Sequence, residues 1–149
     1  MTIFIEINRN EIDINDWNRK VFDNGAGAVS SFIGTTRDHF KDKKVLKLEY
    51  EAYEAMALKE IEKICKDIQN QYKDIIHIAI VHRIGEVPVG EISILIAISS
   101  SHRSDSLKAV NYAIDTVKTT VPIWKKEYYD DSEPNWKNNC ESCHYHPKI

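Results

Sequence analysis

The sequence lacks the features that mark several large classes of protein. No apolar stretch approaches the roughly 20 residues of a membrane-spanning helix, and residues 1–6 lack the basic start of a secretory signal peptide. It contains no glycine-rich phosphate loop, HExxH zinc motif or nucleophile-elbow serine. The net charge is only −3, which argues against general nucleic-acid binding. We therefore expect no membrane or nucleic-acid partner, and any basic site must be local.

Cysteine is also scarce, since the 149 residues include three. A small odd number does not predict a disulfide framework, so we expect a protein of the reducing cytoplasm. Cys140 and Cys143 lie in a tail that also carries His144 and His146. These four side chains are zinc-ligand types, but their spacing is much shorter than that of a zinc finger. A lightly packed tail is the favoured interpretation, and we expect no metal and no cofactor.

Length and periodicity predict one domain over residues 1–149, with residues from about 130 onward a divergent tail. Alternating or continuous apolar patterns predict strands over residues 2–7, 26–33, 45–53, 75–83 and 91–99. Apolar spacings of three and four predict helices over residues 13–22 and 55–72, and between Ser104 and Pro122. This order predicts an α+β fold with helices packed on a mixed or antiparallel sheet.

The same patterns predict finer details. Residues 35–44 are polar and are expected to form a loop, and residues 85–90 are expected to connect two strands. Ser104 is the expected N-cap of the last helix. Leu46 is assigned to the buried face of its strand and Leu107 to the buried face of the last helix.

The most informative pair is His102-Arg103, which follows a strongly apolar run and opens a helix. Backbone N–H groups point outward at a helix N-terminus and the helix dipole favours negative charge, so the pair is well placed to hold an anion. Arg can bind phosphate oxygens in two places, and His exchanges a proton near neutral pH. The alternative interpretation is a solvated turn in which Arg103 pairs with Asp105.

Lys118 and Lys125 are a second group of cations. Seven residues are about two helical turns, so the two side chains would share a face of an unbroken helix, although Pro122 interrupts it. Clustered cations favour a neutral amine on one lysine, which can then act as a base or nucleophile. The alternative is a pair of ordinary surface lysines.

Two further segments are weaker candidates. Arg37 follows small polar residues just past a predicted strand, which suits an anion-binding loop and equally a surface turn. His82 and Arg83 end another strand and are interpreted mainly as structural, with Gly85 permitting a turn and Glu86 pairing with Arg83.

Five short segments then occur in the order seen in a known family. They are residues 25–34 with Arg37, 48–53 with Met56, 82–86 with Gly90-Glu91, 101–104, and 118–127. On these segments, collinear over about residues 25–127, the chain resembles the large, catalytic subunit of molybdopterin synthase. The resemblance implies an α/β hammerhead-type fold and a homodimer. Each large subunit would bind one small ubiquitin-like sulfur-carrier subunit, making a heterotetramer.

The implied reaction transfers sulfur from the carrier's C-terminal thiocarboxylate to cyclic pyranopterin monophosphate, forming the dithiolene of molybdopterin. The resemblance implies that Lys118 and Lys125 are catalytic. The implied substrate-binding residues are Thr35, Thr36, Arg37, His102, Arg103, Lys118, Lys125, Lys126 and Glu127. His102 and Arg103 would reach the site across the dimer, and Lys126 stands where the family often has Arg.

Two other functions remain open from the residues themselves. One is a non-catalytic anion- or nucleotide-binding module whose cations only bind. The other is a zinc-binding interaction protein built on the tail. If the protein is a binding module, Lys118→Ala would weaken anion binding, and no catalytic activity would exist to be lost. If it is a zinc-binding protein, replacing Cys140 and Cys143 would abolish zinc binding.

Overall fold

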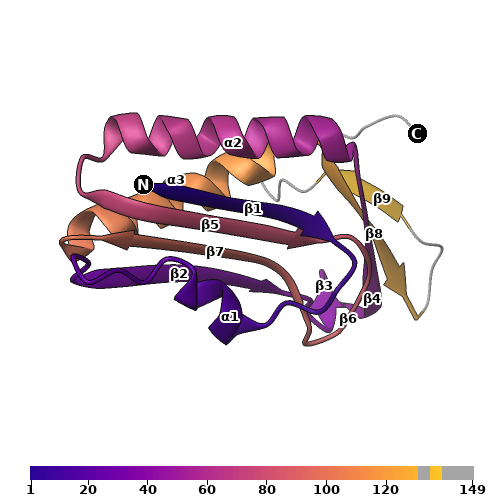
Figure 1. The fold of residues 1–149 in the computed structure, drawn as a ribbon. Coiled ribbons are helices and arrows are strands. Elements are labelled where there is room, and N and C mark those ends of the chain that lie inside the picture. The colour runs from indigo at the N-terminus through magenta and orange to yellow at the C-terminus, as the bar shows by residue number, and fades with distance from the viewer. Residues whose placement is uncertain (131–134, 139–149) are drawn as a thin grey trace.

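The chain folds into two β-sheets and three helices over the residues that the computed structural model describes, 1–130 and 135–138 (Figure 1). The elements are β1 (Thr2–Asn8), α1 (Ile14–Arg19), β2 (Ala28–Thr35), β3 (His39–Phe40), β4 (Lys43–Ala52), α2 (Glu54–Gln71), β5 (Ile75–Arg83), β6 (Gly85–Pro88), β7 (Ile92–Ser100), α3 (Arg103–Thr120), β8 (Ile123–Tyr129) and β9 (Asn135–Asn138). None of the helices in these residues combines the length and apolarity needed to cross a membrane.

The first sheet has the strand order β1-β5-β7-β2, with β1 parallel to β5 and the other pairs antiparallel. Helices cover both of its faces, and strands buried on both faces are expected to be continuously apolar, as β5 and β7 are. Ile78 and Ile80 pack in the cluster that includes α2 and α3. Their neighbours Ala79 and Val81 pack with Trp17 of α1 on the opposite face.

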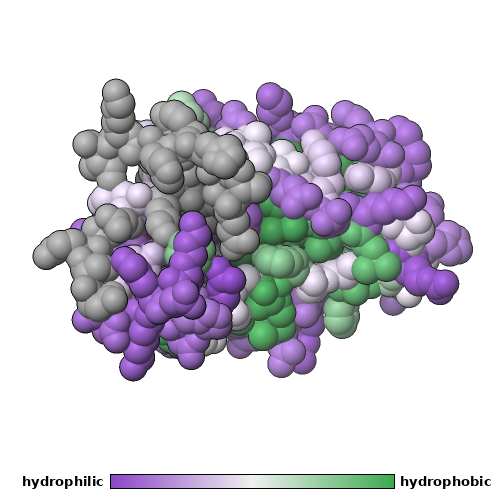
Figure 2. Space-filling view, turned by 180° about the vertical axis from the view of Figure 1, so that it is seen from behind, coloured by the Kyte–Doolittle hydropathy of each residue, from purple (hydrophilic) through white to green (hydrophobic). Residues whose placement is uncertain are grey.

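The second sheet joins β3, β4, β8 and β9, with β6 also paired to β4. It lies beyond the ends of β5 and β2, at one end of the first sheet (Figure 1). Within it β4 and β8 run antiparallel, and Tyr50 is the register partner of Lys125. This pairing brings the residues that follow α3 next to the end of the first sheet. Seen from behind, the molecule carries a contiguous apolar area beside hydrophilic surface (Figure 2).

The α+β fold with helices packed on a mixed sheet is confirmed, and the main strands and helices lie close to their predicted ranges. Four strands were not predicted: the short strands β3 and β6, and β8 and β9, which follow the last predicted helix. Residues 35–44 are not only a loop, because β3 forms a hairpin with β4 through Lys41 and Asp42, both with positive φ. Residues 85–88 form β6, which hydrogen-bonds to β4.

The predicted cap of α3 is wrong. Ser104 lies inside the helix, which begins at Arg103 with His102 as its N-cap residue and no side-chain cap from it. Instead, the Ser100 hydroxyl accepts a hydrogen bond from the backbone N–H of Ser106 at 3.2 Å. The Ser100 hydroxyl, two positions before the N-cap, thus contacts the first turn of the helix.

Two leucines predicted to be buried are exposed. Leu46 is 49% exposed because the pairing of β4 with β8 has an irregularity between Val45 and Lys47, which shifts the alternation of the strand. Leu107 is 59% exposed, since the buried face of α3 runs through Ser106, Ala109, Val110, Ala113, Ile114 and Val117.

Candidate functional site

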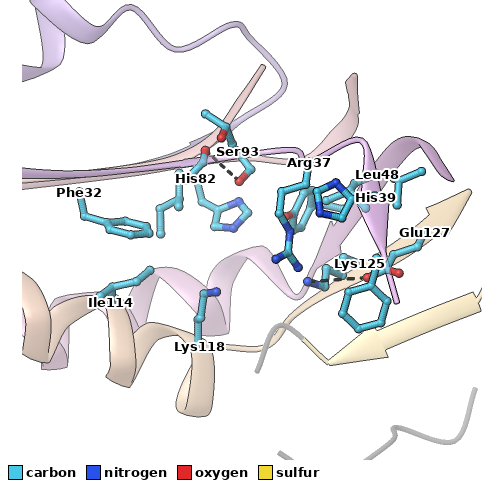
Figure 3. A pocket seen from close by; sticks show the side chains of 16 residues that line it. Phe32, Arg37, His39, Leu48, His82, Ser93, Ile114, Lys118, Lys125 and Glu127 are labelled. Carbon is cyan, nitrogen blue, oxygen red and sulfur yellow. Dashed lines mark hydrogen bonds and ion pairs between the residues drawn. The ribbon is translucent and has the colours of Figure 1, made fainter. Parts of the chain in front are cut away.

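A pocket of about 630 Å³, partly open to solvent, lies between the first sheet, the C-terminal half of α3 and the second sheet (Figure 3). Its polar lining is rich in groups that carry charge or exchange protons: Arg37, His39, His82, Lys118, Lys125 and Glu127. Phe32 and Ile114 supply part of its apolar wall. A concave site with an apolar wall and several converging cations suits an anionic small molecule.

Lys118 reaches the pocket from the last turn of α3. Its neighbour Val117 is buried in the core, and Ile114, one turn earlier, lines the same pocket. Val117 therefore fixes the rotation of the helix, and that rotation points Lys118 into the cavity (Figure 3). A cation at this position also interacts favourably with the negative end of the helix dipole.

Lys125 reaches the same pocket from β8, because the chain turns at Pro122 and returns as a strand. Ile123 and Glu127, each two residues away, lie on the same face of β8. The Lys125 Nζ lies 3.9 Å from Glu127 Oε1, and Glu127 is only 3% exposed. The Glu127 carboxylate also accepts a hydrogen bond from the hydroxyl of Tyr129. Lys118 and Lys125 thus line the same pocket, because the chain turns after α3 and β8 brings Lys125 back beside the helix.

The end of β2 supplies Thr35 to the pocket, and the segment after β2 supplies Arg37. Arg37 is exposed, and its guanidinium lies 5.8 Å from the centre of the Phe40 ring. Thr36 is buried instead, and its hydroxyl donates to the carbonyl of Val87 at 3.3 Å. Thr36 therefore joins this loop to β6 and does not line the pocket.

His82 is the pocket residue whose position the sequence did not reveal. It is 1% exposed, at the end of β5, and burial lowers its pKa to about 4. Its Nδ1 lies 2.8 Å from the carbonyl oxygen of Arg83. One signal was available: His82 directly follows the apolar run from Ile78 to Val81.

The predicted pairing of Arg83 with Glu86 is wrong. Arg83 Nη1 lies 2.8 Å from Glu91 Oε1, across the turn between β6 and β7. Glu86 instead lies 3.5 Å from Lys47 on β4. Gly85 has a φ of +80°, which confirms that a glycine permits the chain to turn between β5 and β6.

Comparison with known proteins decides the family. A family model described as MoaE protein matches residues 7–120, more than half of the chain. The chain belongs to the MoaE family.

Curated relatives support the MoaE assignment along most of the chain. A molybdopterin synthase catalytic subunit of Dictyostelium discoideum is 66% identical over 145 residues, covering 96% of this chain and 92% of that protein. One of Taeniopygia guttata is 49% identical over 138 residues, covering 93% and 88%. One of Drosophila melanogaster is 53% identical over 139 residues, and the match spans 93% of this chain but 38% of that protein.

Solved structures have the same MoaE fold. The molybdopterin synthase structure from Staphylococcus aureus has a TM-score of 0.84 at 39% identity, covering 89% of this chain and 95% of that one. A protein–protein complex of subunits 1 and 2 of molybdopterin-converting factor from Helicobacter pylori has a TM-score of 0.74 at 20% identity, covering 96% and 93%. The predicted family and the molybdopterin synthase activity are confirmed.

Besides Thr36, three residues that the resemblance assigned to the substrate do not line the pocket. Lys126 extends from the other face of β8, with its Nζ 5.4 Å from the ring centre of Tyr128 and 5.3 Å from that of Trp136. His102 and Arg103 are exposed at the opposite end of α3 from Lys118. Their assignment to substrate binding stays a prediction.

The remaining expectations concern cysteines and metals. Cys65 is buried in the core, where burial raises the pKa of its thiol to about 12, so it is unsuited to nucleophilic chemistry. Cys140, Cys143, His144 and His146 lie outside the described residues. Within residues 1–130 and 135–138, no three His, Cys, Asp or Glu side chains gather in a way that could hold a metal ion.

Proposed function

We propose that this pocket transfers sulfur from the C-terminal thiocarboxylate of a small ubiquitin-like carrier subunit to cyclic pyranopterin monophosphate. The observation that carries the proposal is the convergence of Lys118, Lys125 and Arg37 on one partly apolar cavity. Both reactants are anionic, and cations from α3, from β8 and from the segment after β2 surround the space where they would meet. The membership of the MoaE family supplies the reaction that such a site would serve.

The chemistry explains why cations are needed there. The carrier's thiocarboxylate sulfur attacks a substrate carbon and forms a carbon–sulfur bond, while a carbon–oxygen bond of the same carbon breaks and its oxygen leaves as water or with the opened cyclic phosphate. The carrier stays attached as a thioester. Water then attacks the acyl carbon, which returns the carrier as a carboxylate and leaves the sulfur on the pterin. Each attack develops negative charge on oxygen, which preorganised cations stabilise. No cysteine of this chain and no cofactor is required.

The roles of the side chains follow from their surroundings. Lys118 is the proposed catalytic lysine, since it enters the cavity from a helix that is locked in the core through Val117. Lys125 is the proposed second lysine, held near the buried Glu127 carboxylate. Arg37 and Thr35, at the exposed rim, are proposed to bind the phosphate, for which the Arg fork is suited.

We also propose that the working enzyme is a homodimer with one carrier bound to each large subunit. The helix rises about 1.5 Å per residue, so Arg103 and Lys118 are separated by roughly 22 Å in one chain. If His102 and Arg103 bind substrate, a second protomer must supply them. The apolar area in Figure 2 offers surface for a protein partner. The reducing cytoplasm stays the proposed location, based on the odd and small cysteine count.

Reconstitution tests the proposal. The purified protein is mixed with a thiocarboxylated carrier and cyclic pyranopterin monophosphate, and molybdopterin is measured by the fluorescence of its oxidised derivative. We expect Lys118→Ala to lower turnover by about a hundredfold to a thousandfold. The matched control is Lys108→Ala, which removes an exposed lysine of the same helix, and should retain wild-type turnover.

The alternative function predicts a different result. If the cations only bind an anion, the wild type makes no molybdopterin with a competent carrier, while Lys118→Ala still weakens binding of the pterin phosphate. Equal turnover of Lys118→Ala and Lys108→Ala would contradict the assigned role of Lys118.

A further inference from the structure

The mechanism above gives no role to His82, the buried histidine of the pocket. Its ring comes from the end of β5 and Lys118 comes from α3 on the other side of the cavity. Figure 3 shows the two side chains directed toward one another. The positive charge of Lys118 acts on the imidazole, since it contributes, after burial, to lowering the pKa of His82. The two groups therefore interact across the pocket.

The backbone determines which nitrogen of His82 carries the proton. Nδ1 lies 2.8 Å from the carbonyl oxygen of Arg83, and a carbonyl can only accept, so Nδ1 is the donor. With a pKa of about 4, the ring is neutral near pH 7. A neutral imidazole with its hydrogen on Nδ1 has a lone pair on Nε2. His82 therefore presents a hydrogen-bond acceptor and no donor at its second nitrogen.

Several contacts hold this ring in one orientation. The ring of Tyr50 packs against it edge to face, with the centroids 4.9 Å apart and the planes at 68°. The carbonyl that accepts from Nδ1 belongs to Arg83, whose side chain is tied to Glu91 at 2.8 Å. Tyr50 is in register with Lys125 across β4 and β8. The orientation of His82 is thus built into the same two sheets that form the site.

We propose that His82 is a positioning residue, whose Nε2 accepts a hydrogen bond from the Lys118 amine and aims that amine at the carrier's C-terminus. This role rests on the proposed function of Lys118. A neutral acceptor is suited to it, because it orients an ammonium group without cancelling the charge that stabilises the developing oxyanion. A carboxylate in the same place would offset that charge.

A pair of amide variants tests the role, because Gln reaches with its amide to about the place of Nε2 and Asn to about the place of Nδ1. His82→Gln keeps an acceptor facing Lys118, and its kcat in the reconstituted reaction should stay within about threefold of wild type. His82→Asn keeps the contact with Arg83 but not the acceptor. Its kcat should fall by about tenfold to a hundredfold with KM unchanged, as expected for loss of a hydrogen bond to a charged group. Equal kcat for the two variants, at comparable melting temperatures, would overturn the proposal.

A second measurement does not require a substitution of His82. Nitrogen NMR of histidine-labelled wild type at pH 7 should report the Nδ1–H form of His82, and Lys118→Ala should shift its Nε2 resonance. An Nε2–H form, or an Nε2 resonance unmoved by Lys118→Ala, would overturn the inference. Failure of the proposed function has a different signature, namely no molybdopterin from the wild type with a competent carrier, and full turnover by Lys118→Ala would contradict the role of Lys118. An inactive Lys118→Ala with a fully active His82→Asn would overturn the role of His82 alone.

Discussion

The two ends of α3 both carry cations that stood out in the sequence, but their surroundings differ. At the C-terminal end, Lys118 enters a cavity with Lys125 and Arg37, contributed by β8 and by the segment after β2. At the N-terminal end, His102 and Arg103 are exposed. One end is part of a site within the single chain, whereas the other can join a site only through another molecule. Basic residues of one helix thus acquire different surroundings from the tertiary structure.

The apolar residues at the two ends of α3 also differ in burial. Their substitution predicts the largest difference between two variants, in the free energy of unfolding. Val117 is 1% exposed beside the pocket and Leu107 is 59% exposed at the other end. Val117→Asp should lower the free energy of unfolding by about 3–5 kcal/mol, because it buries an unpaired charge. Leu107→Asp should change it by less than about 0.5 kcal/mol. Urea denaturation measures both, and equal effects would show that the faces of α3 are wrongly assigned.

The two histidines near these ends predict a difference in pH dependence. His82 has a folded-state pKa of about 4, below the ordinary 6.5, so the unfolded state binds its proton first as the pH falls. The stability that its neutral form contributes is present above pH 6.5 and is lost toward pH 4. Between pH 7 and pH 5 this loss should be about 2 kcal/mol.

Denaturation at the two pH values checks this prediction against matched variants. His82→Gln should lack this part of the pH dependence, whereas His102→Gln, at the exposed end, should keep the wild-type dependence. A wild-type dependence in both variants would mean that the acid sensitivity arises elsewhere.

Two neighbouring lysines of β8 show where the pocket ends, and they predict the smallest difference, which is in molybdopterin formation. Lys125 faces the cavity, and Lys126 lies over the rings of Tyr128 and Trp136 on the other face. Lys125→Ala should reduce molybdopterin formation by about tenfold or more. Lys126→Ala should stay within about twofold if this chain's own pocket is the only place where its charge acts. A larger loss for Lys126→Ala would move it to a site shared with another protomer.

Much of the fold was predictable because long periodic segments dominate it. The continuous apolar runs of β5 and β7 and the periodicity of α2 identified these elements close to their observed bounds. The strands β3, β6, β8 and β9 were missed. The first three pair with β4 and β9 pairs with β8, and these partners lie beside them only in the folded chain. The exposure of Leu46 follows from an irregularity in strand pairing that no local pattern reveals.

The sequence identified the cationic residues of the site, but it did not show how the fold brings them together. Lys118, Lys125 and Arg37 were identified as candidate anion-binding groups, and all three line one cavity. The helical spacing that suggested a shared face was not the reason, since a turn and a strand bring Lys125 back to the helix. His82 was read as structural because a single histidine ending an apolar strand has no local sign of what lies opposite.

A mixed-dimer experiment tests most directly the claim that opposite ends of two α3 helices complete one site. Lys118→Ala and Arg103→Ala proteins are unfolded together, refolded as a mixture, and assayed by reconstitution beside each variant alone. Each variant alone should be nearly inactive. The mixture should recover about a quarter of wild-type activity, since about half of its dimers contain both variants and each of these has one intact site. Activity no higher than that of the separate variants would contradict a site shared between protomers.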